Sequence, residues 1–296
     1  MKHHFDIALT AIAPVVWGST YYVTTEYLPD GYPITMAALR ALPAGLLLLI
    51  LARQLPHGVW WMRAFVLGAL NFTLFWALLF VAAYRLPGGV AATVGAIQPL
   101  IVVFLAALLL GRTVKASAVV AALIGMFGVG LLVLGSGVSL DPVGILAGIG
   151  GAISMGMGTV LTRKWQAPVP LLTIAAWQLT AGGLLLVPLA LFFEPTLPAL
   201  DTKNFAGIAY LTLIGAALTY ILWFRGVSRI EPGAVSALGF LSPLSAVVIG
   251  WVVLGQALTP TQSAGAGLVL TAIWLGQRAG RVSRPVLQKP HVHTPT

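Results

Sequence analysis

One arginine, Arg40, lies deep inside an apolar stretch of the sequence, where a charged side chain is unusual. A guanidinium there can attract a carboxylate, or it can donate to backbone carbonyls or pair with Glu26 or Asp30, and both interpretations stay open. Two neutral polar side chains, Asn71 and Gln98, lie in other apolar stretches. Ligand contact is slightly favoured for Asn71. For Gln98, ligand contact and an interhelical hydrogen bond are equally compatible with the sequence.

Aromatic side chains also fall inside apolar stretches and could hold an apolar or aromatic ligand by burial and stacking. Deep aromatic rings serve ordinary packing as well, but two of them, Trp76 and Tyr220, recur at equivalent places in the two halves of the chain. The candidate substrate-binding residues are therefore Trp17, Tyr22, Arg40, Asn71, Phe75, Trp76, Gln98, Trp177 and Tyr220.

The residues needed for catalysis or metal binding are missing from these stretches. The chain has no cysteine, and its histidines lie in the termini or in one connection, at His3, His4, His57, His291 and His293. The carboxylates also lie almost entirely in connections, so no acid/base pair and no metal site can be assembled. The sequence therefore predicts neither an enzyme nor a resident metal or cofactor.

The composition indicates what surrounds these residues. The 296-residue chain is 59% hydrophobic and only 8% charged, whereas about 25% of residues are charged in an ordinary soluble domain. Such a chain must bury its surface in lipid. Charges, prolines and turn residues divide it into ten apolar segments, each long enough to span a membrane as a helix. The segments are 7–27, 33–52, 62–84, 88–110, 115–134, 142–163, 170–193, 204–225, 232–254 and 260–278.

The positive charges indicate the orientation, because cytoplasmic connections accumulate Lys and Arg. Ten spans place both termini on one side. If that side is the cytoplasm, only Arg85 and Lys203 lie outside. Thirteen cations then lie inside, namely Lys2, Arg53, Arg63, Arg112, Lys115, Arg163, Lys164, Arg225, Arg229, Arg278, Arg281, Arg284 and Lys289. This distribution explains the basic balance without nucleic acid and predicts an inner-membrane protein whose residues 279–296 form a disordered cytoplasmic tail.

The two halves of the sequence repeat each other. Residues 35–52 align with 173–190 at nine of eighteen positions. Residues 89–111 align with 233–255 at an offset of 144, which matches Gly95 with Gly239 and Pro99 with Pro243. Residues 6–140 and 141–278 therefore form two five-helix repeats, and an odd number of helices inverts the second relative to the first. Inverted repeats are typical of secondary transporters, and these two glycines and two prolines are the expected hinges.

The ten segments, the repeat, and the paired stretches beginning Pro99-Leu100 and Pro243-Leu244 resemble the EamA branch of the drug/metabolite transporter superfamily. The stretch Ala13-Pro14-Val15-Val16-Trp17-Gly18-Ser19 is also similar to that branch's first helix. Members commonly carry Glu after the Leu-Gly that closes each fourth helix, whereas this chain has Arg112 and Gln256. Among the branches, the sequence is most similar to the YddG-type exporters of aromatic amino acids.

The resemblance implies export of amino acids, aromatic and other neutral ones, and of related metabolites or drugs, by alternating access through a central cavity. Proton coupling usually uses a titratable group within the membrane. The sequence offers only Glu26 for this purpose, so facilitated diffusion is expected. The alternatives are a nucleotide-sugar or other phosphorylated-metabolite antiporter, which needs more cations than Arg40, and an enzyme acting on lipid-linked substrates. A homodimer is compatible with the small-residue helix faces.

Overall fold

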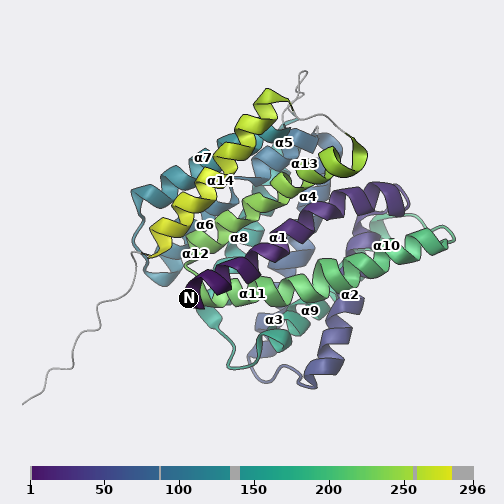
Figure 1. The fold of residues 1–296 in the computed structure, drawn as a ribbon. Coiled ribbons are helices and arrows are strands. Elements are labelled where there is room, and N and C mark those ends of the chain that lie inside the picture. Colours follow the sequence, from purple (N-terminus) through teal and green to yellow (C-terminus); the bar gives the residue numbers. More distant parts are fainter. Residues whose placement is uncertain (1, 87, 134–140, 256–258, 282–296) are drawn as a thin grey trace, which may run out of the picture.

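The computed structural model describes residues 2–86, 88–133, 141–255 and 259–281, and these ranges are helical with no strand (Figure 1). Within these described ranges, nine helices, some with an internal interruption, are long and apolar enough to cross a membrane. They are His3–Tyr27, Pro33–Ala52, Trp60–Ala82, Ala92–Leu110, Ala116–Val133, Pro142–Trp165, Leu171–Phe193, Thr202–Arg229 and Pro232–Val253. The fold is thus the predicted all-helical membrane fold. The predicted tail beyond residue 281 lies outside the described residues.

The tenth predicted span, 260–278, is the helix α14 (Pro260–Arg281), but it is too polar to be counted among the nine. It packs along α7 (Ala116–Val133), which is one of the nine. Lys115 Nζ donates to the Ala279 carbonyl near one end of this pair, and Gln262 Nε2 donates to the Leu132 carbonyl near the other. The two helices therefore run antiparallel along their whole length, and a tenth span remains a prediction.

Four of the spans are interrupted, two of them near the prolines expected as hinges and two at π-helical turns that the sequence did not predict. The third span consists of α3 (Trp60–Gly68), the π-helical turn η1 (Ala69–Thr73) and α4 (Leu74–Arg85). The eighth consists of α10 (Thr202–Thr212), the π-helical turn η2 (Leu213–Leu218) and α11 (Thr219–Arg229). The fourth is divided into α5 (Gly88–Gly95) and α6 (Gln98–Leu110), and the ninth into α12 (Pro232–Ala237), η3 (Leu238–Phe240) and α13 (Leu241–Leu254).

Proline explains the breaks in the fourth and ninth spans. Pro99 and Pro243 have no N–H to donate to the carbonyl four residues earlier, which belongs to Gly95 and Gly239 respectively. The irregular residues, 96–97 and 238–240, lie within the five residues before each proline. A Cβ added at either glycine would meet nothing within 4 Å, so there is free space at both breaks.

Each irregularity in the first half has a counterpart in the second at the offset of 144. The π-helical turns begin at Ala69 and Leu213, and the fourth and ninth spans end at Gly111 and Gly255 with φ of 64° and 65°. Only glycine adopts this left-handed conformation without strain. Local backbone geometry therefore repeats along with the sequence.

The first helix of each sequence repeat packs against helices of the other repeat. The helix α1 (Lys2–Tyr27) packs against α11 and α13, and the helix α8 (Pro142–Trp165) packs against α4 and α6. Glycines spaced along α8 let neighbouring helices approach closely. Gly144 contacts Leu86, Gly148 contacts Val94, and Gly156 contacts Ile101.

The helices α2 (Pro33–Ala52) and α9 (Leu171–Phe193) cross between these groups. At one end of the pair, Glu194 accepts from the Ile34 and Thr35 backbone N–H groups at 2.5 and 2.7 Å. At the other end, Trp177 Nε1 donates to the Gln54 carbonyl at 2.7 Å. The order of the contacts is reversed between the two helices, so α2 and α9 are antiparallel. This is the orientation that an inverted repeat requires of equivalent helices.

Two ends of the molecule can be told apart by their charges. Asp6, Arg225 and Arg229 meet at the end where α1 begins, which we call the basic face because the helix ends there carry most of the cations. Arg85 and Asp141 meet at the opposite face. Between the faces, apolar side chains such as Leu108 and Phe192 are 79% and 83% exposed on the outer surface, as expected where lipid surrounds a protein.

The ion pair at the opposite face is held in place by a helix cap. Asp141 precedes α8, and its carboxylate accepts from the Gly144 N–H at 2.8 Å. This hydrogen bond, together with the charge of Arg85, lowers the pKa of Asp141 below its usual value. The pair itself is long, at 3.5 Å, and solvent-exposed, so it contributes little stability.

Candidate substrate-binding site

The two π-helical turns bring polar groups into the middle of the molecule. A π-helical turn shifts the hydrogen-bond register, and such turns are frequent at functional sites. In η2, the Gly215 carbonyl accepts from Thr219 Oγ1 at 2.8 Å and from Arg40 Nη2 at 2.6 Å. The irregular turn thus supplies an acceptor that anchors the side chain of Arg40 from α2.

The guanidinium of Arg40 has no carboxylate partner in the described part of the chain. Its Nη1 lies 3.5 Å from Thr20 Oγ1, its guanidinium carbon lies 5.4 Å from the centre of the Trp76 ring, and its buried Nε has no hydrogen-bond partner. All seven acidic residues lie in the described part of the chain, and none pairs with Arg40. A half-buried cation with a free donor can bind an anionic group. Arg40 also donates to a backbone carbonyl, that of Gly215, which is the other role that the sequence left open for it.

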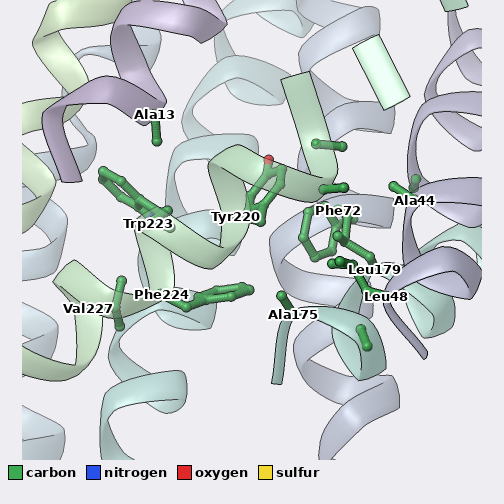
Figure 2. Close-up of a cluster of buried hydrophobic side chains, with 14 of the residues drawn as sticks. Ala13, Ala44, Leu48, Phe72, Ala175, Leu179, Tyr220, Trp223, Phe224 and Val227 are labelled. Carbon is green, nitrogen blue, oxygen red and sulfur yellow. The ribbon is translucent and has the colours of Figure 1, made fainter. Parts of the chain in front are cut away.

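Aromatic rings form a continuous cluster beside Arg40, and Figure 2 shows Tyr220 between Trp223 and Phe72. The Tyr220 centroid lies 4.7 Å from that of Phe72 and 5.1 Å from that of Trp17. Phe72 in turn contacts Trp76 at 5.5 Å, and Trp17 contacts Trp223 at 5.2 Å. Rings from α1, η1, α4 and α11 therefore meet in one place, and an aromatic or apolar solute would find stacking partners there.

Several predicted residues take part in this cluster, and others do not. Trp17, Trp76 and Tyr220 belong to it, and Phe75 packs against it half-buried. Trp17 is fixed by its Nε1, which donates to Thr219 Oγ1 at 3.0 Å. Phe72 and Trp223 belong to the cluster but were not among the predicted site residues. For Phe72 the signal was its place next to Asn71 on the third span.

The remaining predicted residues lie elsewhere. Tyr22 contacts Tyr27 toward the opposite face, with ring centroids 6.2 Å apart. Trp177 is buried near the basic face, where its Nε1 donates to the Gln54 carbonyl. Gln98 is half-buried at the first residue of α6, directly after the break. None of these three is in ring contact with the aromatic cluster.

A second polar cluster surrounds Asn71, the neighbour of Phe72 in η1. Asn71 Nδ2 donates to Gln178 Oε1 at 2.7 Å and lies 3.4 Å from Thr162 Oγ1. Asn71 and Gln178 are only 3% and 1% exposed. Gly158 of α8 abuts the Asn71 side chain so closely that any larger residue there would displace it. Asn71 thus makes an interhelical hydrogen bond to a glutamine that was not predicted as a site residue.

The predicted hinge residues lie at the two span breaks described above. Pro99 is buried, and it borders a small gap that is also lined by Val103, Gly233, Ala237 and Gly276. Gly95, Gly239 and Pro243 are half-buried. The small residues of α12 pack here against α6 near the basic face.

The two acidic residues of α1 differ in burial. Glu26 is exposed at the end of α1, whereas Asp6 is 8% exposed at its start. Asp6 Oδ1 accepts from Arg225 Nη2 at 2.7 Å and from Arg229 Nη1 at 3.3 Å. Both arginines therefore form ion pairs with this carboxylate at the basic face. Among the described residues, no group of three or more His, Asp or Glu is placed to hold a metal ion.

Comparison with known proteins places this architecture in a family. The EamA-like transporter family matches the chain twice, over residues 5–134 and 142–276. The chain belongs to the EamA-like transporter family. The resemblance of its sequence to the EamA branch is thereby confirmed, and its relatives are membrane transporters.

Individual EamA relatives cover nearly the whole chain. Protein PecM of Dickeya dadantii is 44% identical over 280 residues, which is 94% of each chain. The probable terminal-alkyne amino-acid exporter of Streptantibioticus cattleyicolor is 25% identical and covers 94% of this chain and 95% of its own. A crystal structure with 20% identity covers 93% of this chain and 98% of its own, with a TM-score of 0.79, so it shares the fold.

Proposed function

We propose that this EamA protein is a secondary transporter that moves small amphipathic carboxylates, in particular aromatic and other neutral amino acids, through a site between two inverted five-helix halves. The uncompensated charge of Arg40 beside the aromatic cluster carries this proposal. The guanidinium matches a carboxylate and the rings match an apolar side chain. A relative named as a probable amino-acid exporter supports the same substrate class.

The inverted-repeat architecture supports transport by alternating access. The two halves share their π-helical turns and span breaks at one offset, and the equivalent helices α2 and α9 cross antiparallel. Carriers built from inverted repeats switch between two states in which the halves exchange conformations around a central site. The breaks at Gly95–Pro99 and Gly239–Pro243 supply flexible points for that exchange.

The distribution of charge supports a bacterial inner-membrane location with the basic face in the cytoplasm. Arg53, Arg63, Arg112 and Arg278 lie at or beside helix ends on this face. In this orientation both termini are cytoplasmic and Arg40 lies toward the outside. Export by facilitated diffusion fits the site, because Asp6, the buried carboxylate, is held by two arginines away from the aromatic cluster.

A phosphorylated substrate, such as a nucleotide sugar, fits the site less well. Phosphate groups carry more charge than a carboxylate and are usually bound by several cations. Among the described residues, Arg40 is the cation that lies beside the aromatic cluster. An enzyme acting on lipid-linked substrates would also need acid/base groups there, and the neighbours of Arg40 are aromatic rings, hydroxyls and a backbone carbonyl.

Equilibrium binding to the purified protein tests the role of Arg40. Phenylalanine and its decarboxylated analogue phenethylamine are compared on the wild type and on Arg40→Gln, with Arg85→Gln as the matched control at an exposed arginine. A charge-assisted hydrogen bond is worth about 1.5 to 3 kcal/mol, so Arg40→Gln should weaken phenylalanine binding about ten- to a hundredfold. Phenethylamine binding and the Arg85→Gln variant should change little. Equal weakening of both ligands, or no change, would refute the carboxylate assignment.

A further inference from the structure

We propose that Gln178, Thr159 and Asn71 form a second subsite for the substrate carboxylate, on the basic-face side of the aromatic cluster. This inference rests on the proposed transport of carboxylates. In it, the solute's carboxylate is held by Arg40 in one state of the carrier and by the Gln178 subsite in the other. The aromatic cluster, whose Trp76 lies by Arg40 and whose Phe72 follows Asn71 in η1, holds the apolar part of the solute in both states.

The two subsites are formed by equivalent residues of the two sequence repeats. Arg40 is the eighth residue of α2 and Gln178 the eighth residue of α9, and the sequence repeat aligns them. Arg40 donates to Gly215 in η2, and Gln178 accepts from Asn71 in η1, which is 144 residues earlier than Gly215. Because α2 and α9 run antiparallel, Arg40 and Gln178 lie at similar depths from opposite faces.

Unpartnered donors indicate what the second subsite would bind. Asn71 donates to Gln178 Oε1, so the free atom of that amide is Nε2, which is buried and has no partner among the described residues. Thr159 Oγ1 is likewise buried, and no described residue hydrogen-bonds to it. Thr159 lies on α8 between Gly158 and Thr162, both of which meet Asn71. Leaving buried donors unpaired is costly, and a carboxylate offers two oxygens that accept from such donors.

The structure is closed on the side of this subsite. Near the basic face, Arg163 Nη1 of α8 donates to the Val227 carbonyl of α11 at 2.9 Å, and α12 packs against α6. The equivalent pairs near the opposite face are α1 with α4 and α5 with α13, and in the described part of the chain they make no contact of similar extent. Accordingly Arg40 is half-buried while Gln178 is fully buried. Exchange of conformation between the halves would open the Gln178 subsite to the basic face.

The difference in charge between the subsites has a functional consequence. A guanidinium binds a carboxylate more strongly than a neutral amide and hydroxyl do. The carrier should therefore bind the solute more weakly from the basic face than from the opposite face. Low affinity on the cytoplasmic side suits export of a solute that has accumulated in the cell.

Transport measured from each face separately tests the second subsite. Proteoliposomes are prepared in which one orientation is silenced, and KM for phenylalanine is determined from each face. Thr159→Val is the first variant, because it removes a hydroxyl that makes no hydrogen bond and keeps the shape of the side chain. Gln178→Leu is the second. Gln277→Leu is the matched control, since Gln277 is also buried but its Nε2 donates to the Ala234 carbonyl.

The expected result is a several-fold higher KM from the basic face in Thr159→Val and about a tenfold higher one in Gln178→Leu. KM from the opposite face should change less than twofold in both variants, and Gln277→Leu should not show this one-sided effect. Unchanged KM in Thr159→Val, or equal changes at both faces, would overturn the second subsite while leaving the role of Arg40 intact. Failure of the wild type to transport phenylalanine from either face would instead refute the proposed function.

Discussion

The crossing of α2 and α9 predicts an unusual sensitivity to a single methyl group. Gly183 faces the backbone of Leu42, and a Cβ added at Gly183 would lie 2.7 Å from the Leu42 Cα and N atoms. Gly45, the aligned glycine of α2, faces Thr180 in the same way, with 2.7 Å to its Cα. Carbon atoms in ordinary contact lie about 3.5 to 4.0 Å apart. Either Gly→Ala substitution must therefore push the two helices apart by roughly 1 Å.

Moving two packed backbones costs more than rotating a side chain. Overpacking of this kind destabilises a protein by about 1 to 3 kcal/mol, and replacing a helical glycine by alanine returns about 0.5 to 1 kcal/mol. We expect Gly183→Ala and Gly45→Ala each to destabilise the protein by about 1 to 2 kcal/mol. The assay is thermal unfolding in detergent micelles, followed by tryptophan fluorescence.

Gly267→Ala is the matched control, because a Cβ at that position of α14 would meet nothing within 4 Å. It should leave the melting temperature unchanged or raise it. If Gly183→Ala and Gly45→Ala behave like Gly267→Ala, the close antiparallel crossing is wrong. The inverted relation between the two halves would then lose its main structural support.

Other predictions concern the hinges, the ion pairs and energy coupling. Pro99→Ala and Pro243→Ala should lower the transport rate while the melting temperature stays within a few degrees of wild type, and unchanged turnover would remove the hinge assignment. Asp6→Asn should lower the melting temperature clearly more than Asp141→Asn, because the Asp6 carboxylate is buried between two arginines whereas the Asp141 pair is exposed; equal effects would contradict this. Glu26→Gln should leave transport and its insensitivity to a proton gradient unchanged, and loss of accumulation against a gradient in this variant would show that the carrier is proton-coupled.

Much of the fold could be predicted because membrane insertion imposes simple rules on sequence. Apolar length set the spans, and prolines marked helix starts such as Pro33, Pro142 and Pro232, since the first helical residue needs no N–H donor. Apolar length is a weaker guide for α14, which is more polar than the nine spans and packs along α7. The π-helical turns were not predictable, because no residue type specifies an extra residue in a helical turn.

The candidate site was predictable only in part, since depth along a helix says nothing about the direction of a side chain. Trp76 and Trp177 look alike in the sequence, yet Trp76 joins the aromatic cluster and Trp177 binds the backbone of Gln54 near the basic face. Gln178 could have been selected, because the repeat aligns it with Arg40. Its importance became visible once the structure placed it against Asn71.

The most direct test of the account is uptake of radiolabelled amino acids into liposomes that contain the purified protein, with and without an imposed proton gradient. The wild type and Arg40→Gln are measured side by side. The account predicts saturable flux of aromatic and other neutral amino acids that does not depend on the gradient and is largely lost in Arg40→Gln. Absence of flux for every amino acid, or equal flux in the variant, would contradict a carboxylate carrier built around Arg40.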